Sequence, residues 1–390
     1  MTAVLKGVSV VDLGTMITAP LAGMMLADLG ADVLKVEHPQ GGDPFRSFRG
    51  GLYSPHFVAY NRGKRSIKLD LRSEDGRKIL LKLLARTDVL VENYRTGVME
   101  RLGLTREVLQ ATNPRLIHCS ITGFGTSGPY SARPAYDMVG QALSGIASLF
   151  LDPERPETSG PTIPDNATGM YACYGILGAL YERERTGRGR RIEVNMMEAS
   201  IAFMPDPFAN HVRLNIANDR LTRVASSHSF AFRCADGKLL AVHLSSQPKF
   251  WEAFCDVLER LELIDDERFK TRELRIRNYR ELCHVLGDIV VTRPRGEWMT
   301  RLEAADVPFA PVQTIPEVID DPQVQHLHTF YEEQHPVEGR NIGVHRPVLI
   351  DGQRDAVAPA PTLGEHTEAV LTGLGYDDEE ITRLRSASVI

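Results

Sequence analysis

Residues 7–38 read GVSVVDLGTMITAPLAGMMLADLGADVLKVEH, and this stretch decides the expected fold. Two valine-rich runs, 7–14 and 31–38, have the length and composition of buried strands. Between them, Thr18 and Pro20 mark the cap and the first turn of an apolar helix. A strand, a helix and a second strand in this order form a βαβ unit, whose strands pair in parallel.

The same alternation continues beyond this first unit. Further strands are expected at 66–71, 88–94, 115–125 and 190–196. From about residue 225 the pattern changes to a hairpin over 229–244, followed by helices and a proline-rich connector. We therefore predict an α/β protein with a mostly parallel sheet over 1–224, a smaller α+β domain over 225–325, and a tail over 326–390 that packs back on the first domain.

The composition argues against several classes of partner. A net charge of -6 and a pI of about 6.1 give no reason to expect nucleic acid. The five cysteines lack any CxxC spacing, so we expect reduced thiols without a disulfide framework or a zinc site. His326 and His328 lack a supporting ligand cluster for a metal, and His118 with Cys119 is expected in the core.

The beginning of the chain shows no signal peptide, and no apolar run reaches the roughly 18 residues of a membrane span. A cytoplasmic protein with no membrane partner is therefore expected.

The carboxyl ends of the parallel strands are the expected position of a ligand. The first strand is followed by GTMITAP (14–20) instead of GxGxxG, which removes the main support for a nicotinamide or flavin enzyme. Basic residues near the strand ends are either solvated surface charges or a rim that binds phosphate groups. They are Lys35, His38, Arg62, Lys64, Arg65, Arg95 and Arg101.

Asp165 is the single carboxylate in PTIPDNATGM (161–170), directly before a helical run. One interpretation is a helix cap, for which aspartate is a favoured residue. The other is a nucleophile, kept ionised at the positive end of the helix, whose N–H groups stabilise charge on a bound carbonyl. The small residues Ala167 and Gly169 would let a ligand approach the backbone. Position alone leaves both interpretations open.

Several motifs occur in one order along the chain. They are LGADVLKVEHPQGGDPFR (29–46), NRGKRSIKLDLR (61–72), VENYRTGVMERLGL (91–104), SITGFGTSGPY (120–130), RPAYDMVGQA (133–142), PDNATGMYA (164–172), TGRGRRIEVNMMEA (186–199) and LGEHTEAVLTGLGY (363–376). Together they resemble the class III CoA-transferases, the group of formyl-CoA:oxalate and carnitine/crotonobetaine CoA-transferases. The resemblance covers nearly the whole chain.

This resemblance implies an enzyme that moves coenzyme A from an acyl-CoA to a free, small carboxylic acid, with CoA as a substrate and no tightly bound cofactor. It implies a large Rossmann-like domain built from both chain ends, 1–224 and 326–390, around a small domain. It also implies a homodimer whose two chains are interlocked.

The resemblance further assigns site residues. Asp165 matches the family's nucleophile, so that one residue would serve as cap and nucleophile, and Asp137 matches an acidic residue that supports catalysis. In the implied mechanism, Asp165 forms a mixed anhydride with the acyl group and then an aspartyl-CoA thioester, from which the acceptor takes CoA. The positions that match CoA contacts are Thr15, Met16, Ile17, Thr18, His38, Leu69, Asn93, Tyr94, Arg101, Tyr136 and Met196.

Two departures argue against oxalate as the acceptor. Ile17 stands where the oxalate-using enzyme has a glutamine, which favours a less polar acid. ASSH (225–228) stands roughly where that enzyme has a mobile run of glycines, and His228 is either a substrate contact or a loop residue.

Three alternatives remain at this point. An α-methylacyl-CoA racemase of the same fold would use a histidine where this chain has Tyr136, and a tyrosine with an ordinary pKa of about 10 is a poor base at neutral pH. A non-catalytic acyl-CoA-binding protein would need the basic rim but not Asp165. A nicotinamide dehydrogenase would need the missing glycine fingerprint.

Overall fold

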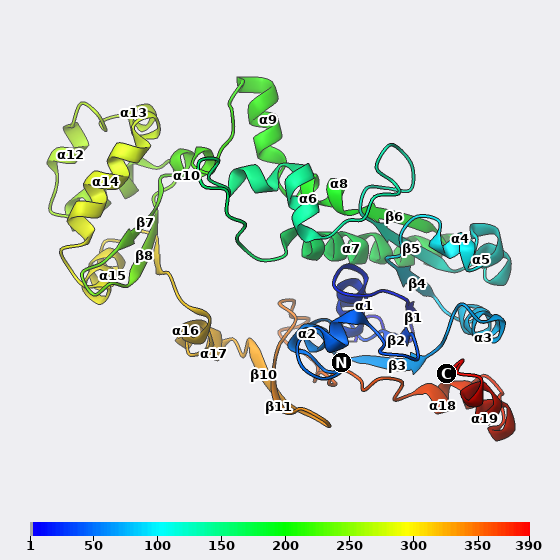
Figure 1. Ribbon diagram of the computed structural model, residues 1–390. Coiled ribbons are helices and arrows are strands. Elements are labelled where there is room, and N and C mark those ends of the chain that lie inside the picture. Colours follow the sequence, from blue (N-terminus) through cyan, green and yellow to red (C-terminus); the bar gives the residue numbers. More distant parts are fainter. Residues whose placement is uncertain (1–2) are drawn as a thin grey trace. The chain divides into compact units, whose positions relative to one another are not determined.

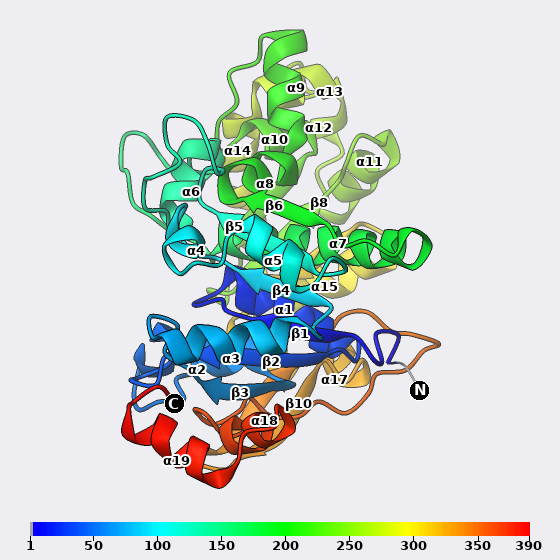
Figure 2. The ribbon, with the colours of Figure 1, turned by 90° about the vertical axis from the view of Figure 1, so that its right-hand side faces the viewer.

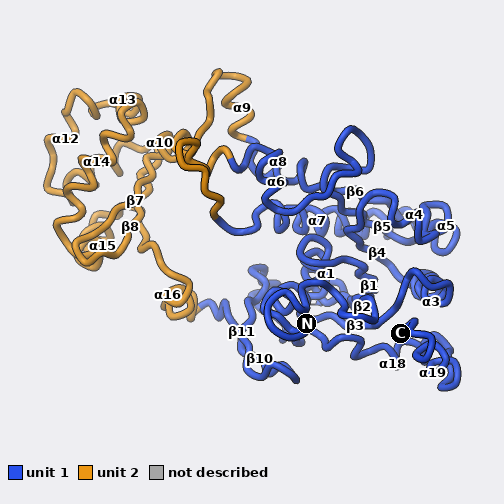
Figure 3. Tube along the Cα trace, in the orientation of Figure 1, with its two compact units in different colours: residues 1–147, 160–205, 327–390 blue, residues 148–159, 206–326 orange. Residues whose placement is uncertain are grey.

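The computed structural model describes residues 3–390 and divides into two compact units. Unit 1 contains the residues up to Ala147 together with Gly160–Pro205 and Leu327–Ile390, and unit 2 contains Ser148–Ser159 and Asp206–His326 (Figure 3). The predicted small domain, 225–325, falls inside unit 2. That unit also takes up the segment 206–224, which precedes the predicted boundary, and the separate stretch 148–159.

Unit 1 is built on a six-stranded sheet in the order β3-β2-β1-β4-β5-β6 (Figure 1). Every neighbouring pair in this sheet is parallel, as the alternating pattern predicts. The order reverses between β1 and β4, and in open α/β sheets such a reversal opens a crevice at the carboxyl ends of the strands. The strands are β1 (Ser9–Asp12), β2 (Asp32–Glu37), β3 (Lys64–Lys68), β4 (Val89–Glu92), β5 (Ile117–Thr122) and β6 (Arg191–Asn195).

Helices cover both faces of this sheet (Figure 2). On one face, α1 (Thr18–Asp28) and α7 (Ile163–Thr186) bury small apolar side chains against the valines of β1 and β4. On the other face, the leucines of α3 (Glu74–Leu84) share a core with α5 (Arg106–Thr112) and with the C-terminal helices α18 (Thr367–Gly373) and α19 (Asp378–Ser386). The tail of the chain therefore packs on the sheet that its beginning forms.

The remaining elements of unit 1 are short. They are η1 (Pro44–Ser47), α2 (Pro55–Asn61), α4 (Val98–Arg101), α6 (Asp137–Ser144), α8 (Met196–Phe203) and the hairpin β10 (Phe330–His335) with β11 (Gly339–Val344). A further turn, η2 (Ile146–Leu149), crosses the boundary between the units.

Unit 2 contains the expected hairpin, β7 (Ser229–Arg233) and β8 (Leu239–His243), extended by β9 (Phe309–Pro311) into an antiparallel sheet. Its aromatic core includes Phe230, Trp251 and Trp298. The helices of this unit are α9 (Pro205–Leu214, with Pro205 in unit 1), α10 (Thr222–Ser226), α11 (Pro248–Val257), α12 (Glu262–Asp265), α13 (Arg272–Arg277), α14 (Tyr279–Val290), α15 (Arg295–Ala304), α16 (Ile315–Ile319) and α17 (Pro322–His326).

The expected β3 strand begins two residues earlier than predicted because Lys64 and Arg65 pair with Val33 and Leu34 of β2. The Lys64 side chain then points into the unit. Its ammonium is fully buried and bonds Asp12 at 2.8 Å, while that of Lys35 bonds Asp43 at 2.9 Å. The two lysines are therefore neither solvated surface charges nor part of a phosphate-binding rim. Each ammonium is buried in the core and forms an ion pair with a buried carboxylate.

Candidate active site

A cavity of about 520 Å³ lies in unit 1 at the carboxyl ends of β1, β4 and β5. This is the position that the reversal of strand order favours, and its volume is typical of a small-molecule site. It is formed by the loop after β1, the loop after β4 and the segment before α6. The lining residues that the sequence analysis singled out are Thr15, Met16, Ile17, Thr18, Asn93, Tyr94, Arg95, Tyr136, Asp165 and Met196.

The loop after β1 is held from two sides. Asn93 accepts the Thr15 N–H at 2.9 Å and donates to the Thr15 carbonyl and the Thr18 hydroxyl at 2.8 and 2.9 Å. The carboxylate of Asp43 accepts the Met16 N–H at 3.1 Å. Met16 has a φ of 65°, which is a strained conformation for a residue other than glycine. The surrounding hydrogen bonds therefore fix a loop that would otherwise relax.

Lys35 connects this loop to the buried charges below it. Its ammonium donates to the Gly14 carbonyl at 2.7 Å and pairs with the carboxylate of Asp43, which in turn holds Met16. Burial opposes the charged ammonium, but the carboxylates of Asp43 and Asp12 outweigh burial and raise the pKa of Lys35. Lys35, which was expected either in solvent or at a phosphate-binding rim, thus supports the loop from beneath.

Asp165 lies in the first turn of α7, two residues after Ile163 begins the helix. The helix therefore begins before Asp165 and not directly after it as expected, and Asp165 is not the cap, a position that Thr162 occupies. Burial, and then the nearby charge of Asp137, raise the pKa of Asp165 to about 7. The expectation that the helix end keeps this carboxylate ionised is wrong, because both effects favour its neutral form.

Asp137 begins α6 and touches Asp165 through the backbone. One oxygen of Asp137 accepts the Asp165 N–H at 3.1 Å, and the other accepts the side-chain amide of Gln141 at 2.7 Å. Asp137 thus satisfies an N–H group in the first turn of α7 and places a second carboxylate beside Asp165. The two aspartates that the sequence pointed to are brought together.

The first turn of α7 has no N–H group left for a bound carbonyl. Ile163 and Asn166 donate to the carbonyls of Pro161 and Thr162, Pro164 has no N–H, and Asp165 donates to Asp137. The start of α1 differs. The side chain at its cap position, Ile17, provides no hydrogen bond, and within residues 3–390 no hydrogen bond of the Ile17 or Thr18 N–H is found. Unpaired donors in the cavity thus come from α1 instead of α7.

Gly169 and Ala167 are small for a different reason than ligand access. A Cβ atom at Gly169 would lie 2.7 Å from the Thr18 carbonyl of α1, and Ala167 is only 3% exposed. The absence of a side chain at Gly169 lets α7 pack closely against α1. That contact places Asp165 in the same cavity as the start of α1.

Three of the positions that match CoA contacts are not among the cavity's lining residues. The ring of His38 lies close to a guanidinium nitrogen of Arg72, 2.6 Å away. Leu69 is 2% exposed and belongs to the core, and Arg101 is an exposed residue of α4.

Arg133 lines the cavity and was missed in the sequence. Its guanidinium stacks over the rings of Tyr130 and Phe124, with 4.7 and 5.8 Å to the ring centroids. No ion pair of Arg95 or Arg133 with a carboxylate is found in the part of the chain that the structure describes. The only sequence signal for Arg133 is its position at the start of the motif RPAYDMVGQA (133–142), which also contains Tyr136 and Asp137.

The ASSH segment, residues 225–228, is partly helical in unit 2. Ala225 and Ser226 end α10, and His228 is 2% exposed with a φ of 47°. Burial, and then the charges of Arg275 and Arg272, lower the pKa of His228 to about 4. His228 is thus a buried residue of unit 2.

Comparison with known proteins identifies the family and the fold of the chain. The model of CoA-transferase family III matches residues 5–367, so the chain belongs to CoA-transferase family III. Human succinyl-CoA:glutarate CoA-transferase is 34% identical over 99% of this chain and 90% of its own length. Formyl-CoA:oxalate CoA-transferase of Streptomyces coelicolor is 33% identical, with 99% of each chain covered. A CAIB/BAIF family protein of Brucella suis superposes with a TM-score of 0.84 at 32% identity, covering 95% of this chain and 99% of that one.

The chain is accordingly an enzyme that transfers coenzyme A between an acyl-CoA and a carboxylate. The curated relatives favour this reaction over racemisation, passive binding and hydride transfer. Within residues 3–390, no helix is both long and apolar enough for a membrane span. In the same range, no three histidine, cysteine or acidic side chains are grouped as metal ligands would be.

Proposed function

We propose that Asp165 is the nucleophile of this CoA-transferase. The observation that carries the proposal is a half-buried carboxylate with a pKa of about 7 in the cavity at the topological switch point. Near neutral pH a substantial fraction of such a group is ionised, and a carboxylate of higher pKa is the stronger nucleophile. Its water-poor surroundings also protect an activated ester from hydrolysis.

The reaction proceeds in four acyl-transfer steps. An oxygen of Asp165 attacks the thioester carbonyl, the C–S bond breaks, and CoA thiolate leaves a mixed anhydride on the enzyme. The thiolate then attacks the aspartyl carbonyl, which releases the donor acid and leaves an aspartyl-CoA thioester. The acceptor carboxylate displaces the thiolate to form a second anhydride. Attack of the thiolate on the acceptor carbonyl yields the new acyl-CoA and regenerates Asp165.

Each step builds negative charge on a carbonyl oxygen. The N–H groups of Ile17 and Thr18 support this part of the proposal, because they are unpaired at the positive end of α1 and belong to the same cavity as Asp165. Asp137 acts as a positioning residue that holds the first turn of α7 and keeps the pKa of Asp165 high.

We propose that CoA binds along the loops after β1 and β4, with contacts from Thr15, Asn93, Tyr94, Tyr136 and Met196. Arg95 and Arg133 would meet the anionic groups of the two substrates, since charged donors without carboxylate partners suit phosphate and carboxylate oxygens. His38, Leu69 and Arg101 are proposed for the part of CoA that extends beyond the cavity. The acceptor is proposed to be an acid less polar than oxalate.

The working form is proposed to be a cytoplasmic homodimer with interlocked chains. Along α7, Met170, Tyr174 and Tyr181 are 52%, 76% and 64% exposed, an apolar stripe that suits burial against a second copy. All five cysteines are free thiols, which suits a reducing compartment. Light scattering should give a mass of twice that of the chain. Tyr174→Lys places a charge in the apolar stripe and should lower the measured mass toward that of one chain.

Trapping of the intermediate tests the proposal. The enzyme is incubated with succinyl-CoA and a panel of other acyl-CoAs in the presence of hydroxylamine, and peptides are mapped by mass spectrometry. A hydroxamate on Asp165 is expected with at least one donor and is absent from Asp165→Asn. If CoA is shown to bind and no donor modifies Asp165, the residue is not the nucleophile.

A further inference from the structure

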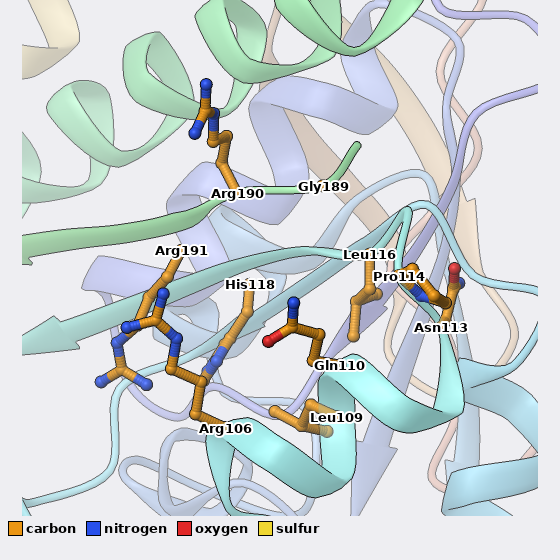
Figure 4. A pocket seen from close by; sticks show the side chains of 10 residues that line it. All are labelled: Arg106, Leu109, Gln110, Asn113, Pro114, Leu116, His118, Gly189, Arg190 and Arg191. Atoms are coloured by element: carbon orange, nitrogen blue, oxygen red, sulfur yellow. The ribbon is translucent and has the colours of Figure 1, made fainter. Parts of the chain in front are cut away.

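A second cavity of about 90 Å³ lies in unit 1 where β5 and β6 begin (Figure 4). Its walls come from α5, from the turn before β5 and from the segment that leads into β6. The strands are parallel, so this cavity and the Asp165 cavity lie at opposite ends of the sheet. We name it the basic pocket; its lining residues include Arg106, Gln110, His118, Arg190 and Arg191.

Three arginines and one histidine line the basic pocket, and none of its lining residues is acidic. Figure 4 shows the guanidinium groups of Arg106 and Arg191 at the same end of the pocket, beside His118, while Arg190 points away. Two cations that face one small cavity repel each other, and an anion between them removes that cost.

The arginines differ in how much of their charge is already used. Arg190 pairs with Glu182 and is fully occupied as a salt bridge. Arg191 uses its Nε for Glu193 at 2.7 Å, which leaves its terminal nitrogens for another acceptor. For Arg106, no carboxylate partner is found among residues 3–390. Arg106 and the ends of Arg191 are thus the available donors.

His118 provides the buried part of the pocket. It is 7% exposed, and its Nε2 lies 3.3 Å from a carboxylate oxygen of the buried Glu92. No hydrogen bond of its other ring nitrogen is found in the described part of the chain. The amide of Gln110, one turn along α5 from Arg106, likewise has no bonded partner in that part. An anion would therefore meet a polar wall as well as two guanidinium groups.

We propose that the basic pocket binds a small oxyanion of the phosphate or sulfate type. Arg106, Arg191 and Gln110 would donate to its oxygens, with His118 at the base. The volume of about 90 Å³ suits one small tetrahedral oxyanion or the phosphate group of a larger ligand. Guanidinium groups are the donors that proteins use most effectively for such anions.

Isothermal titration of the full-length enzyme with inorganic phosphate tests the proposal, at an ionic strength kept constant with sodium chloride. Saturable one-site binding is expected, together with a melting temperature that rises with phosphate as mass action requires. Arg106→Gln is expected to weaken phosphate binding at least about tenfold, because a charge-assisted bond is lost. Arg188→Gln, an exposed arginine of the same segment outside the pocket, serves as the matched control and should bind normally.

Titrations with sulfate and with adenosine monophosphate distinguish the sources of the anion. Binding of both free anions but not of the nucleotide assigns the pocket to inorganic oxyanions, whereas nucleotide binding assigns it to a phosphate group of a larger ligand. The proposal is overturned if phosphate shows no saturable heat, or if Arg106→Gln and Arg188→Gln bind it equally. Arg133→Gln removes a proposed anion contact of the Asp165 cavity and should bind phosphate like the wild type, which separates this site from the proposed active site.

Discussion

Glu37 and Asp165 are two shielded carboxylates of the same unit, and their surroundings are opposite. Glu37 is 3% exposed and accepts hydrogen bonds from Arg46 at 2.6 and 2.7 Å and from Ser66 at 2.6 Å. Burial opposes its charged form, but these bonds and the charge of Lys35 hold the pKa of Glu37 below its usual range. Asp165 has a second carboxylate as its neighbour, and its pKa is raised to about 7.

The comparison shows that burial by itself does not make a carboxylate reactive. Where donors and cations surround the group, as at Glu37, the charge is stable and its lone pairs are used for structure. Where a buried carboxylate has no cation beside it, as at Asp165, its oxygen lone pairs are available for attack and its proton affinity is high.

Replacement of the reactive carboxylate should have the largest effect. We expect Asp165→Asn to lower kcat at least about 1,000-fold, or about 4 kcal/mol in the barrier, because the group that forms the covalent intermediate is lost. Steady-state transfer from succinyl-CoA measures it. Asp32→Asn, an exposed aspartate of the same unit, is the control and should stay within about twofold of the wild type. Comparable loss in both variants would contradict the assignment.

Removal of the partner of the structural carboxylate should destabilise the fold. Arg46→Met leaves Glu37 buried without its guanidinium and is expected to cost about 3–5 kcal/mol of unfolding free energy. Arg65→Met breaks the exposed pair with Asp32 and should cost less than about 1 kcal/mol. Urea denaturation of both variants measures the difference. Equal costs would mean that burial does not distinguish the two pairs.

Asp165 should change the stability of the wild type with pH in the opposite sense to a carboxylate whose pKa is lowered by folding. The folded protein holds the Asp165 proton up to a pKa of about 7, whereas the unfolded chain loses it near pH 4. Wild-type stability therefore falls between about pH 4 and pH 7, and the asparagine variant is spared that loss. We expect Asp165→Asn to be more stable by roughly 1–2 kcal/mol at pH 8, with little difference at pH 4.5. Thermal melts of both proteins over this pH range measure the difference in stability. A difference that stays the same from pH 4.5 to pH 8 would refute the prediction.

The contribution of Asp137 should be the smallest of these effects. Asp137→Asn keeps an oxygen that can accept the Asp165 N–H but removes the neighbouring charge. Because burial is the larger cause of the raised pKa, the acidic limb of the pH–kcat/KM profile should move down by about one pH unit or less. An unchanged limb would mean that the group titrating in the profile is not Asp165.

Much of unit 1 could be predicted from sequence because its signals are local. The valine-rich strands, the apolar α1 and the cap of α3, where Ser73 accepts the Gly76 N–H, are each defined by a few adjacent residues. The position of the cavity also follows, since parallel strands bring their carboxyl ends to one edge. The residues alone left Asp165 as either a cap or a nucleophile, and the choice of the nucleophile and of Asp137, 28 residues away, depended on the resemblance to a family.

The environments of individual charges could not be predicted in this way. Lys35 and Lys64 were expected either as solvated charges or at a phosphate-binding rim, because a basic residue at a strand end usually reaches water. Their carboxylate partners, Asp43 and Asp12, come from other loops and strands, so only the folded chain shows that the lysines are buried. The same holds for Gly169, whose close neighbour Thr18 lies in another helix.

The alternation of strands and helices, the family, and the residues that are chemically suited to the reaction can all be read from the amino-acid sequence. These properties depend on hydrophobic periodicity and residue type, which are written along the chain. Only the tertiary structure decided which carboxylates are neutralised and which is left reactive, and which helix offers free N–H groups to the cavity. Proton affinity and hydrogen bonding depend on distances between residues far apart in sequence, and packing alone sets those distances.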